Sequence, residues 1–144
     1  MSDELLDEVL SHFRTQNRVS LATSEGDQPR VRIMSLIRLE NRFYFVTGAW
    51  GGANTAKVRQ ITENPHIEFV MQVERDGDIG NIRAAGLAFL EDDPTIRERL
   101  FREIGWVNNY FKGPKDPSYV VLGMEVASYQ YRPPGRRDII SIDA

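Results

Sequence analysis

The residues best suited to chemistry lie in 47–65, where a strand end, a glycine-rich loop and a short helix follow one another. Gly48, Gly51 and Gly52 allow the backbone to pass close to a ligand. Lys57 falls in the first helical turn, where free backbone N–H groups and the helix dipole already favour an anion, most often a phosphate. The segment lacks the Gly-Lys-Ser/Thr of a P-loop and the glycine spacing of the dinucleotide fingerprint. It fits either a phosphate site or a flexible loop before a solvated helix.

The ends of this helix can be placed from residue types. Asn54 or Thr55 can cap its start, because a short side-chain oxygen accepts a free backbone N–H there. Asn64-Pro65 ends it, because the residue before a proline is pushed out of the α region.

A second candidate is the strand predicted over 28–39, whose residues alternate between two faces. One face carries Val31, Ile33, Ser35, Ile37 and Leu39, and the other carries Arg30, Arg32, Met34, Leu36 and Arg38. The pattern predicts an apolar face packed on a core and an arginine face turned to a ligand or partner; a solvated arginine face is the alternative. The short turn 40–42 makes the next strand, 43–47, an antiparallel neighbour, which brings Arg32 toward the glycine loop.

Composition excludes several classes of site. The chain of 144 residues has no cysteine, so disulfides, thiolate nucleophiles and cysteine-ligated metals are absent. Its two histidines, His12 and His66, make a histidine-rich zinc site implausible and leave a carboxylate-ligated ion open. The net charge of −3 gives no reason to expect nucleic acid. The acidic amphipathic N-terminus is unlike a signal peptide and no apolar run approaches a membrane span, so we expect a cytoplasmic protein.

The element order predicts one domain, 1–144, that is mainly β with helices. Helices are expected over 3–16, 55–64 and 94–104, and strands over 18–24, 28–39, 43–47, 66–74, 81–91 and 119–131. Sequential, mostly hairpin-linked strands favour an antiparallel barrel with helices at its ends. The aromatic segment 106–111 is expected to be irregular and the tail from Arg132 extended and loose.

Four motifs together resemble the pyridoxamine 5′-phosphate oxidase-like family of FMN-binding split barrels, in its general stress protein 26 branch. They are PRVR at 29–32, FYFVT at 43–47, TAKVRQI at 55–61 and ENP at 63–65. The segment 106–122 also resembles that branch, and the likeness extends over roughly 17–131. It implies a six-stranded antiparallel split β-barrel that forms a homodimer with FMN at the subunit interface.

The resemblance also implies the cofactor residues. Arg32 and Lys57 would hold the flavin phosphate, with Thr55 as a hydroxyl donor. Backbone groups of Ile33, Met34, Ser35, Val46 and Thr47 would run along the ring. Gln60, Asn81 and Trp106 occupy further flavin-contacting positions, with Trp106 contributed by the second subunit.

Two departures bear on activity. Ala56 stands where relatives carry an arginine, so one phosphate contact is missing unless Arg30 or Arg59 replaces it. The carboxyl end lacks the arginine–histidine motif of true pyridoxamine phosphate oxidases, so vitamin B6 oxidation is not expected. We expect an FMN-dependent oxidoreductase with a nicotinamide donor and no catalytic side chain. The alternatives are a non-catalytic stress or sensing protein, or another ligand in the same cleft: F420, or haem with His66 as its ligand.

Overall fold

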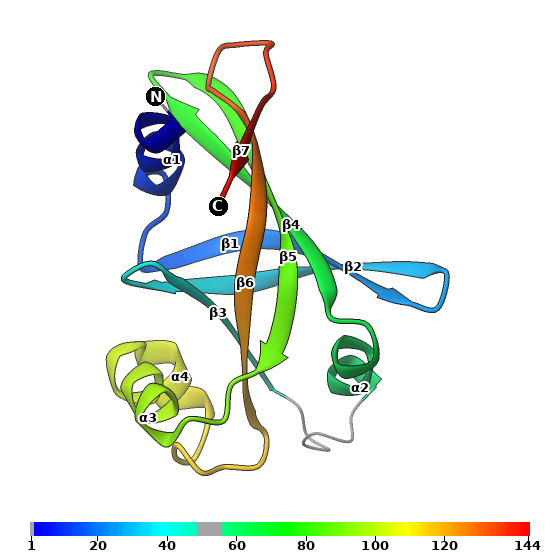
Figure 1. Ribbon diagram of the computed structural model, residues 1–144. Coiled ribbons are helices and arrows are strands. Elements are labelled where there is room, and N and C mark those ends of the chain that lie inside the picture. The colour runs from blue at the N-terminus through cyan, green and yellow to red at the C-terminus, as the bar shows by residue number, and fades with distance from the viewer. Residues whose placement is uncertain (1, 49–55) are drawn as a thin grey trace.

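Antiparallel β-structure dominates the computed structural model, which describes residues 2–48 and 56–144 (Figure 1). The helices are α1 (Ser2–Ser11), α2 (Ala56–Glu63), α3 (Pro94–Glu103) and α4 (Gly105–Tyr110). The strands are β1 (Gln16–Glu25), β2 (Gln28–Leu39), β3 (Arg42–Gly48), β4 (His66–Arg75), β5 (Asp78–Leu90), β6 (Tyr119–Arg132) and β7 (Ile140–Asp143). No helix in these described ranges is long and apolar enough to cross a membrane.

The strands form a single sheet that closes on itself. Their order is β3-β2-β1-β4-β5-β6-β7, and an additional pairing of β3 with β6 joins six of them into a ring. All the pairings are antiparallel. Figure 1 places α1 against the upper end of this ring and α3 and α4 against the lower end. The predicted antiparallel barrel with helices at its ends is confirmed.

Two apolar clusters hold the elements together. The larger fills the barrel, where strict alternation along β4 buries Ile67, Phe69, Met71 and Val73. The smaller lies between the barrel wall and the lower helices, and includes Tyr44, Val121, Leu100, Ile104 and Val107. Burying apolar side chains on both faces of the wall ties α3 and α4 to the same strands that form the barrel.

Helix α1 is shorter than the predicted 3–16. It ends at Ser11 because the chain from Gln16 onward pairs with β2, starting opposite Ile37. The Asn17 side chain accepts from the Arg14 amide at 2.8 Å and donates to the Arg14 carbonyl at 2.7 Å. These bonds give the backbone an alternative to another helical turn.

Two predictions for the later chain are wrong. The segment 106–111 is not irregular: residues 105–110 form α4, since a helix buries Val107 completely in the lower cluster. The tail is not loose: β7 pairs with β6 and buries Ile142 in the barrel cluster. Pairing satisfies backbone groups that a free tail would leave to water.

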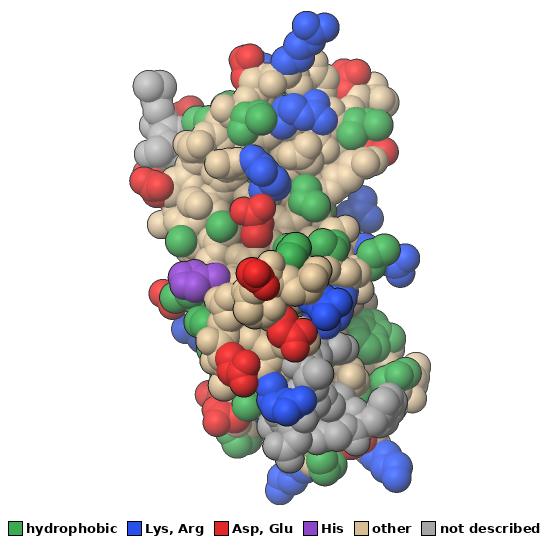
Figure 2. All heavy atoms as spheres, turned by 90° about the vertical axis from the view of Figure 1, so that its right-hand side faces the viewer, with side chains coloured by type: hydrophobic (Ala, Val, Ile, Leu, Met, Phe, Trp, Pro, Cys, Tyr) green, Lys and Arg blue, Asp and Glu red, His purple; other side chains and the backbone are tan. Residues whose placement is uncertain are grey.

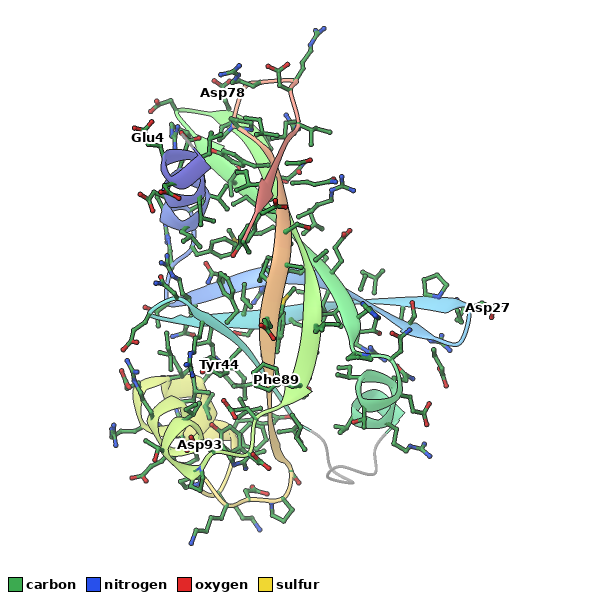
Figure 3. The ribbon with its side chains drawn as sticks, in the orientation of Figure 1. Glu4, Asp27, Tyr44, Asp78, Phe89 and Asp93 are labelled. Carbon is green, nitrogen blue, oxygen red and sulfur yellow. The ribbon has the colours of Figure 1, made fainter. Side chains whose placement is uncertain are left out.

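The predicted apolar face of β2 is buried at Ile37 and Leu39, as expected, but not in the first half of the strand. The side chains of Val31 and Ile33 are 70% and 71% exposed, because here β2 pairs with β1 in a hairpin that extends past the barrel. Figure 3 shows Asp27 at the tip of that hairpin. The face predicted to carry the arginines outward instead turns toward the interior: Leu36 is fully buried, and Met34 packs on the barrel cluster.

The small residues of β5 make room for another strand. A Cβ at Gly86 would overlap the backbone carbonyl of Glu125 on β6, where the β5–β6 register shifts at Ala85/Gly86. A strand rich in small residues can admit a ligand, another strand or a partner subunit, and here the neighbour is a strand.

Candidate functional site

The β1–β2 hairpin and α2 meet around the guanidinium of Arg32. Arg32 lies on β2 opposite Leu21 of β1, half-buried and directed toward α2. Its Nη1 donates to Thr23 Oγ1 and its Nη2 donates to Gln60 Oε1, each over 3.3 Å. Thr23 and Gln60 are only 3% and 7% exposed, so the guanidinium is fixed by two buried neutral acceptors.

Gln60 also links the hydrogen bonds of Arg32 to a carboxylate. Its Nε2 donates to Glu25 Oε2 over 3.0 Å, and Arg30 Nη2 reaches the same oxygen at 3.4 Å. The Glu25 and Arg30 side chains are about half exposed (50% and 49%), so their ion pair contributes little stability. The charge of Glu25 is therefore matched by Arg30. Among the described residues, Arg32 has no carboxylate within ion-pair distance.

This arrangement leaves the positive charge of Arg32 available beside α2. A guanidinium carries five N–H donors, and the bonds that Arg32 makes to Thr23 and Gln60 use neutral acceptors. A half-buried cation without a counter-charge favours an anion, and a phosphate or carboxylate can accept two of its donors at once. The chemistry of the Arg32 cluster is thus anion binding.

The start of α2 lies partly outside the described residues. Lys57 is the second residue of the helix, in its first turn, and Gln60 follows one turn later, so both positions lie along the same side. Contact between Gln60 and Arg32 therefore places the first turn of α2 beside the hairpin. The side chain of Lys57 and all of Thr55 are not among the described residues, and neither is the glycine loop 49–55. Val58 and Ile61 form the buried side of the helix.

The sheet forks next to this cluster. Pairing of β2 with β3 starts at Leu39–Arg42 and stops at Leu36–Phe45. Beyond that point β2 continues through Ile33, Met34 and Ser35, which pair with β1 alone in the described chain. Strand β3 diverges and continues through Val46 and Thr47, paired with β6.

The fork distributes the five predicted ring-contacting residues over its two branches. The backbone edge of 33–35 carries N–H and C=O groups that a ligand with a polar edge can pair with. Side chains contribute less here, since Val46 and Thr47 are 3% and 7% exposed and are directed into packed regions.

A cavity of about 520 Å³ runs along this edge of β2. It is lined by Ile33, Met34 and Ser35, by Trp106 of α4, and by Gln16, Asn17 and Arg18 of β1. The sequence predicts that Trp106 comes from a second subunit, whereas the structure places it in this cavity within one chain. The volume of the cavity is in the range of small-molecule sites.

Asn81 is the predicted residue that one chain does not bring to the site. It lies on β5 between Gln72 and Arg132, and β1 and β4 separate β5 from β2 in the sheet. Two other arginines could make up for the alanine at position 56. Of these, Arg30 is paired with Glu25 and Arg59 is exposed.

The outer face of the sheet beside the hairpin carries exposed apolar residues. Ile33 on β2 neighbours Ser20 on β1, which neighbours Val70 on β4, so the three share a face. Val70 is 38% exposed and Ile33 is 71% exposed, although both are large apolar residues. Figure 2 views the hairpin and α2 side, where green apolar side chains are interspersed with blue and red charged ones.

Thr23 and Glu25 belong to the cluster but were not singled out from the sequence. Alternation along β1 gives a signal for Thr23, because it shares the buried face with Val19 and Leu21. Since Leu21 lies opposite Arg32, a buried hydroxyl two residues away must point toward that arginine. In the described part of the chain, no group of three or more histidine, aspartate or glutamate side chains is arranged to hold a metal.

Comparison with known proteins identifies the family. The family model for pyridoxamine 5′-phosphate oxidase matches residues 5–132. General Stress Protein 26 from Bacillus anthracis str. Sterne superposes with a TM-score of 0.73 at 21% identity, over 96% of this chain and 99% of that chain. A FAD-binding protein from Mesorhizobium loti gives 0.66 at 13% identity, over 90% of each chain.

A haem-binding protein from Mycobacterium smegmatis gives a TM-score of 0.69 at 14% identity, over 90% of this chain and 53% of that chain. At these identities the likeness shows a shared fold. No curated protein matches the chain in sequence.

Proposed function

Because the chain belongs to the pyridoxamine 5′-phosphate oxidase family, we propose that it binds FMN at the fork between β2 and β3 and acts as an oxidoreductase. The observation that carries the proposal is the guanidinium of Arg32, half-buried beside α2 and held by neutral acceptors. The flavin-binding neighbour from Mesorhizobium loti supports a flavin as the ligand class.

The phosphate end of FMN belongs at the Arg32 cluster. A phosphate monoester carries a charge of about −1.5 to −2 at neutral pH and offers three strong acceptor oxygens. Arg32, the N–H groups at the start of α2 and Lys57 would supply the donors and the opposing charge. Thr55 would add a hydroxyl donor.

The flavin ring belongs along the cavity at the fork. The backbone groups of Ile33, Met34 and Ser35 would pair with the polar edge of the ring, and Val46 and Thr47 would line the other branch. The indole of Trp106 would pack against an apolar part of the ring. When bound, FMN supplies hydride or electron transfer, with a nicotinamide as donor, while the chain supplies binding and orientation.

The exposed apolar face of the hairpin supports a homodimer as the functional state. Val31 and Ile33 lie next to the proposed ring site, and two such surfaces meeting would exclude water from it. A second copy would also be the source of Asn81, which one chain keeps three strands away from Arg32.

Titration of the purified apoprotein with FMN tests the proposal. Quenching of flavin fluorescence with one FMN per chain is the expected result, and absence of any uptake contradicts it. Oxidation of NADH or NADPH by the loaded protein then separates an oxidoreductase from a non-catalytic flavin-binding stress or sensing protein, which would bind FMN without turnover.

Haem is the second candidate ligand, favoured by the fold shared with a haem-binding protein. His66 is exposed at the start of β4 and lines a groove of about 530 Å³ with Glu68, Ala85 and Leu87. A Soret band that shifts in a His66→Ala variant would support haem. The deazaflavin F420, tested by the same fluorescence titration, would compete with FMN if both use the fork.

A further inference from the structure

A separate cavity of about 600 Å³ opens at the other side of the molecule, where the barrel splits. Strand β6 pairs with β3 as far as Met124 and then with β7 from Ser128, and the cavity lies at the interval between them. Helix α1 covers it through Leu6 and Leu10. None of the residues proposed to hold FMN lines this cavity, so it is independent of the fork.

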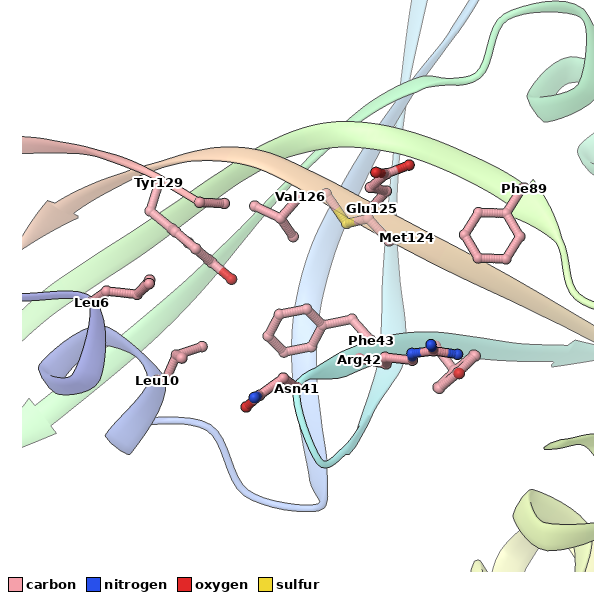
Figure 4. Close-up of a pocket in the computed structure, with 12 residues that line it drawn as sticks. Leu6, Leu10, Asn41, Arg42, Phe43, Phe89, Met124, Glu125, Val126 and Tyr129 are labelled. Atoms are coloured by element: carbon pink, nitrogen blue, oxygen red, sulfur yellow. The ribbon is translucent and has the colours of Figure 1, made fainter. Parts of the chain in front are cut away.

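The lining is mostly apolar and partly aromatic. Phe43, Met124 and Val126 form its wall, and Figure 4 shows them around an open space below β6. Flat rings and a flexible thioether suit an aromatic guest, since both make favourable contacts with ring faces and edges.

Tyr129 gives the cavity a specific polar group. Its side chain is 3% exposed, and Figure 4 shows the hydroxyl directed into the space between α1 and Phe43. No described residue hydrogen-bonds to this hydroxyl, and since no buried side-chain oxygen or nitrogen of the described residues lacks a partner, the oxygen is accessible from the cavity. The contrast with Tyr131 is direct, because the Tyr131 hydroxyl donates to Glu8 over 2.6 Å.

Arg38 hydrogen-bonds to two of the residues that line the cavity. Its guanidinium donates to the Leu10 carbonyl at 2.7 Å and to Asn41 Oδ1 at 3.3 Å, and both acceptor residues line the cavity. Burial raises the pKa of Tyr129 to about 12 despite the nearby charge of Arg38, so the phenol keeps its proton and can donate. The positive charge of Arg38 acts on the same phenol, and a cation near a donor favours a guest with an electron-rich oxygen.

We propose that this cavity binds a small aromatic molecule through a carbonyl oxygen that accepts a hydrogen bond from Tyr129. The rings and Met124 hold the body of the guest, and the hydroxyl sets its orientation. Binding at this place orders α1 against β3 and β6, because the guest contacts all three elements.

The test compares two probes that differ in one group. Acetophenone has the carbonyl oxygen and ethylbenzene lacks it, and each is titrated into the ¹⁵N-labelled full chain while amide shifts of the lining residues are followed. Tyr129→Phe removes only the hydroxyl. The expected result is an affinity for acetophenone about tenfold lower in Tyr129→Phe, as for loss of one hydrogen bond, with ethylbenzene unchanged. Repeating the titration with FMN present gives the same result if the two sites are independent.

Two further variants test the cavity and the role of the hydroxyl. Leu6→Trp, which fills the cavity from α1, should abolish binding of both probes. Tyr129→Phe should unfold at the same temperature as the parent, because the hydroxyl that it removes faces the cavity and makes no hydrogen bond to a described residue. No shifts with either probe, equal affinity of acetophenone for both proteins, or a Tyr129→Phe protein that is clearly destabilised would each overturn the inference.

Discussion

Replacing Arg32 by glutamine tests the phosphate site through its charge. Glutamine removes the cation and keeps an N–H donor for Thr23 or Gln60, so the local network is disturbed little. Hydrogen bonds to a charged group contribute about 1.5–3 kcal/mol each. Loss of one such bond lowers FMN affinity by roughly tenfold to 150-fold. We expect a value near the lower limit, because Arg32 is half-buried and must share its donors with two existing acceptors.

The assay is flavin fluorescence quenching with FMN and with riboflavin, which has the same ring and no phosphate. Arg32→Gln should weaken FMN binding and leave riboflavin binding within about twofold of the parent, since a phosphate contact is absent from riboflavin. Arg30→Gln is the matched control, because Arg30 is half exposed and already paired with Glu25. Equal losses for FMN and riboflavin, or an effect of Arg30→Gln as large as that of Arg32→Gln, would refute the assignment.

Three other predictions address the frame around the site. Gly86→Ala should destabilise the fold by about 1–3 kcal/mol in chemical denaturation, because the new methyl group meets the Glu125 carbonyl. Gly105→Ala is the control and should not destabilise the fold, because the space around Gly105 is open. Desolvation lowers the pKa of His12 below 6.5, so unfolding free energy should rise with pH between that lowered value and 6.5, and His12→Gln should remove this slope in urea titrations at several pH values. Ile33→Glu should give a folded monomer in sedimentation experiments, since the side chain is 71% exposed; an unchanged dimer would remove Ile33 from the interface.

Much of the fold follows from local pattern in the sequence. Alternation predicted the strands of the barrel, and the short turn 40–42 predicted that the strands on either side of it are antiparallel neighbours. The start of the helix expected over 94–104 is confirmed and has a local cause: the Asp93 side chain accepts from the Thr95 amide at 2.8 Å, and Pro94 begins the helix.

The wrong predictions concern segments whose structure depends on contacts with parts of the chain that are distant in the sequence. Strand β7 depends on pairing with β6 across a turn at 133–139, and nothing in four alternating residues fixes that partner. The whole face of β2 that carries Val31 was assigned to the core by its apolar character, but the hairpin extends past the barrel and leaves Val31 and Ile33 exposed, whereas Ile37 on the same face is buried. Hydrophobic alternation gives two faces and does not say which one a core will cover.

The candidate site was predictable only as far as local sequence pattern determines it. The hairpin turn at 40–42 placed Arg32 toward the glycine loop that precedes α2, and the bond between Arg32 and Gln60 puts it beside that helix. The neutral partner Thr23 and the Glu25–Arg30 pair depend on the β1–β2 register, which a turn-based prediction does not specify to the residue.

A crystal structure of the chain with FMN bound is the decisive measurement for the proposed phosphate site. We expect phosphate oxygens within about 3 Å of the Arg32 guanidinium and the first turn of α2, with the ring along 33–35. A phosphate bound elsewhere, with Arg32 still engaged by Thr23 and Gln60 alone, would contradict the proposal.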